Sequence, residues 1–263
     1  MQSTKIAADQ TEHTPLLSNR FVFVLTSVVA VLALLSIVIS LFGHRFGERW
    51  ALSGHSDSTE ILDISIGLDR LQLASNTIRF EEQRKSGTSE RIDLYLLWPE
   101  MTGYSRDLRR RFDDLSQANA LIFLQLSQST MSRDMSGRIG PIYSSLFDGE
   151  AGAGPFGLSQ HRFRAGTGYD EEVLLTAPRP GRPDYAVRCL LPAPGAAPSG
   201  GDCQRDIHVG RDLTVLYRFS STLLRDWQAI DAAVETYVST RIVAAPAPAK
   251  LQKRANPARN DSL

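Results

Sequence analysis

The sequence is poor in lysine and cysteine, and both shortages exclude classes of protein. Only 4 lysines accompany 25 arginines, and Lys85 is the only lysine between residues 43 and 243. Schiff-base chemistry and Ser–Lys catalysis therefore have a single candidate residue, with no S-x-x-K motif near it. The chain has 2 cysteines, no C-x-x-C or H-E-x-x-H pattern, and scattered histidines. We therefore expect no metal site of the usual zinc-binding types.

Net charge is also absent, since 29 basic residues balance 29 acidic ones. Between residues 43 and 243 there are 23 basic and 26 acidic residues, so this part of the chain has a net charge near −3. Domains that bind nucleic acid are usually basic. We therefore expect no nucleic-acid partner.

A glycine pattern at residues 152–157 matches G-x-G-x-x-G in letters. In a dinucleotide-binding fold this motif follows a strand and begins a helix, so that free N–H groups meet the pyrophosphate. Here it contains Pro155, follows a helix-like segment and leads into a strand pattern. The sequence therefore predicts an ordinary loop and no bound cofactor.

The dominant feature that is present is an unbroken apolar run at residues 21–42. It contains 22 residues and no charge, proline or glycine. As a helix it is about 33 Å long, which is enough to cross a bilayer core of about 30 Å. It is longer than the apolar core of a secretory signal, and no Ala-x-Ala cleavage site follows it. We therefore expect an uncleaved transmembrane helix in contact with the lipid bilayer.

The run divides the chain into five expected segments. Polar residues lead into the run, a Gly- and Ser-rich stretch follows it, and alternating apolar residues begin at Ile61. A Pro/Ala-rich basic stretch ends the sequence. The segments are a disordered tail at 1–19, a transmembrane helix at 20–43, a juxtamembrane linker at 44–60, a folded domain at 61–243 and a disordered tail at 244–263.

The two cysteines, Cys189 and Cys203, flank a Pro- and Gly-rich loop between two strand-like runs. Such a loop can bring the ends of two strands to disulfide distance, and closing it would stabilise the domain by about 3 kcal/mol. The alternative is two unrelated buried thiols in a reducing compartment. We favour a disulfide, which places the domain outside the cytoplasm.

The predicted orientation of the helix in the membrane is inferred from this disulfide. Lys5 and Arg20 precede the apolar run and Arg45 and Arg49 follow it, so the basic flanks are balanced. The excess of arginine over lysine indicates GC-rich coding and a bacterial source. The expected location is the inner membrane, with a cytoplasmic N-terminus and a periplasmic C-terminal domain.

Secondary-structure patterns predict an α+β domain, mainly antiparallel, with about three helices. Strand patterns occupy 61–68, 71–80, 91–98, 120–127 and five shorter segments between 161 and 220. Helix patterns occupy 105–118, 132–146 and 222–243. In the last helix, Asp226, Asp231 and Glu235 are expected to lie largely away from the apolar face.

Charged residues within these elements have ordinary structural interpretations. Arg109, Arg110 and Arg111 can pair with acidic residues four positions away along a solvated helix. Asp63 and Asp93 interrupt strand patterns, but the outward faces of the strands accommodate both. A catalytic role for either carboxylate would require burial or crowding.

The sequence therefore favours a non-enzymatic protein and identifies no catalytic residue. We expect a single-pass anchored domain that binds a protein partner in the membrane or envelope. Two alternatives remain: an envelope hydrolase whose catalytic residues are dispersed in the sequence, or an accessory subunit of a membrane complex.

Overall fold

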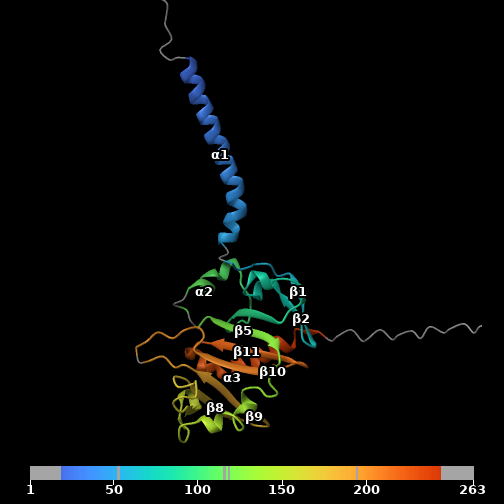
Figure 1. The fold of residues 1–263 in the computed structure, drawn as a ribbon, viewed down its shortest axis with the longest axis vertical. Helices are drawn as coiled ribbons and strands as arrows, with labels where there is room; N and C mark the ends of the chain where they lie inside the picture. Colours follow the sequence, from blue (N-terminus) through green and yellow to red (C-terminus); the bar gives the residue numbers. More distant parts are fainter. Residues whose placement is uncertain (1–18, 52–53, 115–116, 118, 194, 244–263) are drawn as a thin grey trace, which may run out of the picture. The chain divides into compact units, whose positions relative to one another are not determined.

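The computed structural model describes residues 19–51, 54–114, 117, 119–193 and 195–243, with the backbone alone for residues 19 and 38–51. The chain forms two compact units, a helical unit up to residue 53 and a domain that begins at Gly54. Figure 1 shows the fold of each unit.

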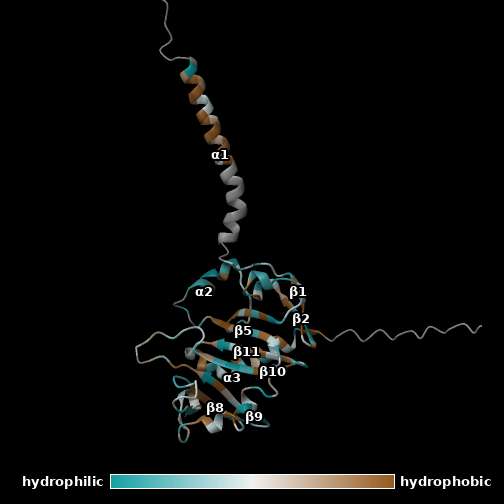
Figure 2. Cartoon of the chain, viewed as in Figure 1, coloured by the Kyte–Doolittle hydropathy of each residue, from teal (hydrophilic) through white to brown (hydrophobic). Residues whose placement is uncertain are grey.

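The first unit is the helix α1, which spans Asn19–Ala51. Its window Arg20–Ile37 has a mean hydropathy of 2.4 and none of it is buried; the apolar character of this part is visible in Figure 2. The hydroxyls of Thr26 and Ser27 donate to carbonyls one turn back, at 2.8 and 2.9 Å, so they leave the helix intact. The helix is long and apolar enough to cross a membrane.

The helix is longer than the expected segment 20–43. Residues 44–51, expected in the linker, continue it, because no proline interrupts them. The rest of the expected linker that is described belongs to the domain, where Asp57 accepts a hydrogen bond from Arg106 at 2.6 Å.

The domain contains twelve strands in its described residues and two α-helices. The strands are β1 (Ile61–Ile66), β2 (Asp69–Ala74), β3 (Gly87–Thr88), β4 (Arg91–Leu97), β5 (Leu121–Gln128), β6 (Gly152–Ala153), β7 (Ser159–Arg162), β8 (Val173–Arg179), β9 (Arg182–Cys189), β10 (Cys203–Val209), β11 (Leu213–Phe219) and β12 (Ile242–Val243). The helices are α2 (Arg109–Asp113) and α3 (Trp227–Ser239).

Two sheets organise the domain. The larger has the order β4-β5-β11-β10-β9-β8-β7-β6 and the smaller the order β12-β2-β1-β3. All described pairings are antiparallel except that of β1 with β3. Helix α3 covers one face of β10 and β11 (Figure 1). The expected α+β class with mainly antiparallel strands is therefore confirmed.

Two helix predictions differ from the structure. Segment 132–146 forms two 3₁₀ turns, Ser136–Arg138 and Tyr143–Leu146, instead of a continuous helix. Gly137, Gly140 and Pro141 lie inside it, and such residues are poor in helix interiors. In segment 105–118 the described α-helix is only α2, preceded by a 3₁₀ turn at Arg106–Leu108.

The core between α3 and the larger sheet contains a buried polar cluster that the sequence did not indicate. Asp231 of α3 is 6% exposed, contrary to its expected place away from the apolar face. It is four residues from Trp227 and three from Val234, so it shares their side of the helix. Its carboxylate accepts hydrogen bonds from Arg205 at 2.8 Å, Arg179 at 2.7 Å and the Tyr217 hydroxyl at 2.8 Å.

Candidate binding groove

The outer face of strands β4, β5 and β11, opposite the core, forms the floor of a groove. Strand register places side chains on this face in two rows across the sheet. Tyr95, Phe123 and Arg218 form one row. The second row consists of Asp93, Gln125 and Leu216. Since side chains alternate between faces, the neighbours Leu94 and Leu124 point into the core instead.

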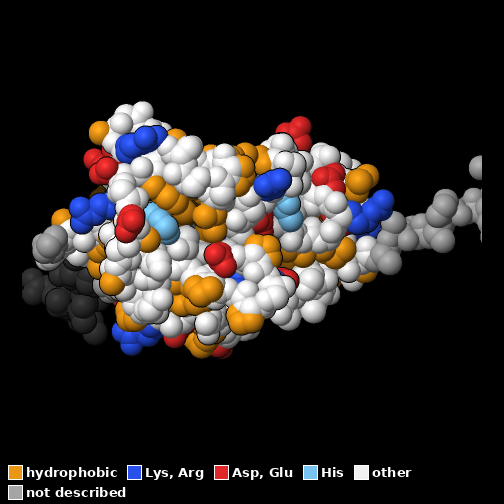
Figure 3. Space-filling model, turned by 90° about the horizontal axis from the view of Figure 1, so that it is seen from below, with side chains coloured by type: hydrophobic (Ala, Val, Ile, Leu, Met, Phe, Trp, Pro, Cys, Tyr) orange, Lys and Arg blue, Asp and Glu red, His pale blue; other side chains and the backbone are white. Residues whose placement is uncertain are grey.

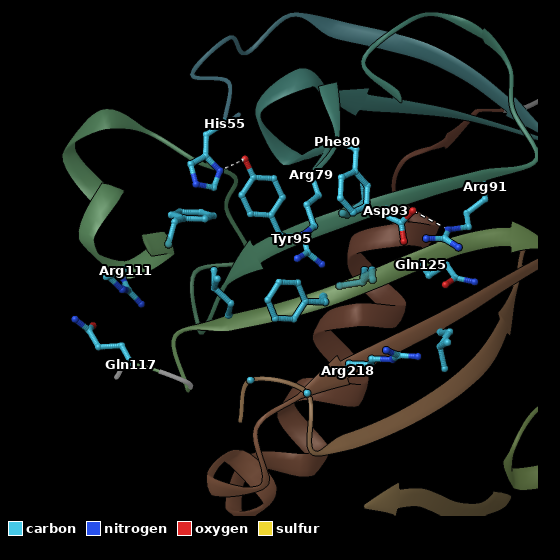
Figure 4. Close-up of a pocket in the computed structure, with 18 of the residues that line it drawn as sticks. His55, Arg79, Phe80, Arg91, Asp93, Tyr95, Arg111, Gln117, Gln125 and Arg218 are labelled. Atoms are coloured by element: carbon cyan, nitrogen blue, oxygen red, sulfur yellow. Dashed lines mark hydrogen bonds and ion pairs between the residues drawn. The ribbon is translucent and has the colours of Figure 1, made fainter. Parts of the chain in front are cut away.

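Four segments distant in sequence form the walls of the groove, whose volume is about 490 Å³. Figure 4 shows side chains that line it. Arg79 and Phe80 follow a 3₁₀ turn, Ser75–Thr77, that leads out of β2. The other walls come from the segment before β1, the α2 region and the loop between β9 and β10, which contribute in turn His55; Arg111, Phe112, Asp114 and Gln117; and Gly200 and Gly201.

The loop wall is fixed at its base by the two cysteines. Cys189 and Cys203 are directly opposite in the β9–β10 pairing and are joined by a disulfide in the structure. Asp202 restrains the loop further, because its carboxylate accepts bonds from the hydroxyls of Ser199 at 2.6 Å and Ser221 at 2.8 Å. The cysteine pair predicted from the sequence therefore lies beside the groove and supports the loop that contributes Gly200 and Gly201.

The groove has an excess of positive charge. Four arginines and two aspartates line it, giving a formal charge of +2. Arg91 pairs with Asp93 at 2.7 Å, and Arg111 pairs with Glu100 at 2.7 Å. Arg79 and Arg218 have no ion pair or side-chain hydrogen bond with any residue that the structure describes. The face shown in Figure 3 carries basic and acidic side chains interspersed.

Arg79 is held by aromatic rings. Its guanidinium carbon lies 5.1 Å from the centroid of the Phe80 ring and 5.1 Å from that of Phe123. Cation–π contacts of this kind contribute about 0.5–1 kcal/mol each at exposed sites. In the described part of the chain its side-chain N–H groups donate to no acceptor, so they can bind a ligand.

One end of the groove is closed by an aromatic cluster around His55. The imidazole stacks on Tyr104 with ring centroids 4.5 Å apart, and its Nε2 lies 2.9 Å from Asp113. A carboxylate can only accept, so Nε2 donates to Asp113, and Nδ1 forms a second hydrogen bond with the Tyr95 hydroxyl at 3.0 Å. Burial raises the pKa of Tyr95 to about 12, so this hydroxyl stays protonated at neutral pH.

The structure distributes the other sequence candidates as follows. Asp93 lies in the groove, whereas Asp63 lies on β1, where its pKa is lowered, chiefly by a hydrogen bond from Arg70. Of the expected pairs on the arginine run, Arg109–Asp113 forms at 2.9 Å. Arg111 instead pairs with Glu100. Residues 152–157 form the strand β6 and a 3₁₀ turn before β7.

A serine–histidine pair at the end of β5 has the residue types of a nucleophile and its base. Ser129 Oγ lies 3.1 Å from His208 Nε2 and 3.0 Å from the Met131 carbonyl oxygen, so the rotating hydroxyl can donate to either. In the described part of the chain, no carboxylate bonds to the other imidazole nitrogen. The pair therefore lacks the third group that orients the base in a catalytic triad.

Sequence reasoning missed the groove residues Arg79, Phe123, Gln125 and Arg218. The alternation of β5 placed Phe123 and Gln125 on the outer face, which in an antiparallel sheet is usually solvated. Only strand register shows that Arg218 comes to lie beside Phe123. The available sequence signal was the aromatic residue Phe123 on the outward face of β5, which is unusual for a solvated face.

Comparison with known proteins shows similarity at the level of fold. No family model and no curated protein matches the sequence. An immunity protein of the Stenotrophomonas maltophilia type IV secretion system has a similar fold, with a TM-score of 0.51 and 13% sequence identity over 73% of this chain and 96% of that chain. The iron-regulated outer membrane lipoprotein FrpD of Neisseria meningitidis has a TM-score of 0.46 and 7% identity over 72% of this chain and 97% of that chain, which is too distant to support an argument.

Proposed function

We propose that the chain is a membrane-tethered binding module whose domain binds a protein partner through the groove on β4, β5 and β11. The groove is the observation that carries this proposal. It combines exposed arginines that have no ion pair or side-chain hydrogen bond with the described residues and half-buried aromatic rings on a sheet face that the described chain leaves open. Arginine and aromatic residues dominate the energetics of protein interfaces.

The occurrence of this fold in an immunity protein of a secretion system is compatible with such a module. At 13% identity the likeness concerns the fold, so the proposal does not extend to immunity itself. The residues of the groove support it independently.

For the tether, we propose that α1 crosses the inner membrane with its N-terminus in the cytoplasm and the domain in the periplasm. The exposed apolar surface of α1 supports membrane insertion. The disulfide between Cys189 and Cys203 supports an oxidising compartment for the domain. The flanking basic residues are balanced and support neither orientation.

The proposal predicts that reversing the unpaired charges of the groove abolishes partner binding. After crosslinking in intact cells, we expect a protein partner to copurify with the wild type. Its amount should be lower by about tenfold or more with the full-length variant Arg79→Glu/Arg218→Glu. A partner that binds the positively charged groove would face like charges in this variant, which cost several kcal/mol, and about 1.4 kcal/mol already gives a tenfold loss. The measurement is quantitative mass spectrometry of the purified chain.

The matched control is Arg162→Glu/Arg225→Glu, which reverses two exposed arginines outside the groove. This variant should retain the copurified protein. Equal retention by the two double variants would contradict the proposed function of the groove.

A further inference from the structure

We infer that the arginine groove binds an acidic segment of its protein partner, with Arg79 and Arg218 each receiving a carboxylate. By arginine groove we mean the floor and walls described above. The inference rests on the proposed function and deepens it by giving the chemistry of the partner. Three properties of the groove lead to it.

The first property is a surplus of hydrogen-bond donors. In the described chain, the guanidinium groups of Arg79 and Arg218 and the side-chain amide of Gln125 have no acceptor. The carboxylate of Asp93, by contrast, accepts from Arg91 at 2.7 Å and from Gln83 at 2.9 Å. A ligand that satisfies the groove must therefore supply acceptor oxygens.

The second property is the position of Arg79. Its guanidinium carbon lies over the Phe80 and Phe123 rings, 5.1 Å from each centroid, so the two rings restrict the group before any ligand arrives. Arg–carboxylate pairs are often bidentate, and the planar guanidinium suits that geometry. Positioning in the free protein reduces the side-chain entropy that binding costs.

The third property is local charge. The groove has a formal charge of +2 within a domain whose sequence is near −3, so its positive potential is local rather than general. A local patch selects an acidic segment without attracting polyanions over the whole surface. A positively charged groove on a domain of slightly negative net charge therefore favours a specific contact with an acidic segment.

The size and openness of the groove favour a polypeptide over a free small acid. Pockets for small molecules bury about 70–90% of the ligand surface. Here the three guanidinium groups of Arg79, Arg91 and Arg218 are all exposed, so the groove is open to a continuing chain. An extended acidic segment can lie over Phe123 and reach both unpaired arginines.

The test uses fluorescein-labelled hexaglutamate with the full chain in a neutral detergent, and fluorescence anisotropy as the readout. We expect hexaglutamate to bind and hexaglutamine and hexalysine not to bind. Arg79→Gln and Arg218→Gln should each weaken binding about tenfold, and the double variant about a hundredfold, because each removes a charge-assisted hydrogen bond. The control Arg162→Gln/Arg225→Gln should bind as the wild type does.

Four outcomes would overturn the inference: no binding of hexaglutamate, equal binding by the double variant, equal binding of hexaglutamine, or preference for another anion. Free citrate and phosphatidylglycerol vesicles are included as competitors for this last purpose. If hexaglutamate fails while charge reversal still removes the copurified partner, the acidic-segment inference is wrong and the proposed binding function stands. If hexaglutamate does not bind and charge reversal does not remove the copurified partner, the groove is not a binding site.

Discussion

Replacing Asp231 by alanine should lower the free energy of unfolding by about 3–5 kcal/mol, the range measured when one partner of a buried ion pair is removed. Asp231 is the shared acceptor of Arg205, Arg179 and the Tyr217 hydroxyl. Arg205 is 1% exposed, so without the carboxylate its charge would be buried with no counter-ion. Burial also raises the pKa of Tyr217 well above its ordinary value, so Tyr217 stays a neutral donor and cannot replace the lost anion.

Such a loss is large against a typical domain stability of about 5–15 kcal/mol. Asp231→Asn preserves the volume but removes the charge and replaces one acceptor oxygen by an NH2 donor, so it should also be strongly destabilising. It keeps the test usable if the alanine variant does not fold. The measurement is urea denaturation of the full chain in detergent, with tryptophan fluorescence as the readout.

The matched control lies on the same helix. Glu235 pairs with Arg182 at 2.8 Å, but both side chains are exposed. Surface pairs of this kind contribute about 0–1 kcal/mol, so Glu235→Ala should have a small effect. Comparable losses from Asp231→Ala and Glu235→Ala would contradict the described role of the buried cluster.

The second large effect concerns the disulfide. Cys189→Ala/Cys203→Ala should lower the free energy of unfolding by about 3 kcal/mol, as the chain-entropy model gives for a loop of about 15 residues. The sequence separation of the two cysteines is 14. Both side chains are buried, so reduction of the wild type with dithiothreitol after partial unfolding should give a similar loss of stability. Urea denaturation with and without reductant measures this difference in the free energy of unfolding.

The same cysteines report the compartment of the domain. In intact cells, a periplasmic domain should contain the oxidised pair, so that a maleimide reagent labels the denatured chain only after reduction. Labelling without prior reduction would contradict both the disulfide in the cell and the proposed orientation. The control is the double alanine variant, which should never be labelled, since the chain has no other cysteine.

The features predicted from the sequence were those that depend on local pattern. The apolar run at 21–42 indicated a long helix, and the alternation at Ile61–Ile66 indicated a strand with one buried face. Periodicity failed where single residues override it. Apolar spacing over 132–146 resembled a helix, but Gly137, Gly140 and Pro141 lie inside the segment and the chain turns there.

The groove could not be predicted, because it depends on contacts between distant segments. Tyr95, Phe123 and Arg218 come from three strands and become neighbours only through strand register. Arg79 reaches the groove from the end of the other sheet's hairpin. No spacing rule in a single sequence contains that information. The same limit applies to Asp231, whose burial follows from the positions of Arg205 and Arg179 on β10 and β8.

Site-specific photocrosslinking in intact cells tests the central claim, that the arginine groove is the surface on which a protein partner binds. A photoreactive amino acid would replace Gln125 on the groove floor and, as the control, the exposed Gln72 on β2 of the smaller sheet. We expect a discrete covalent adduct with one protein from position 125 and none from position 72. An adduct from position 72 with none from position 125, or identical adducts from both, would contradict the claim.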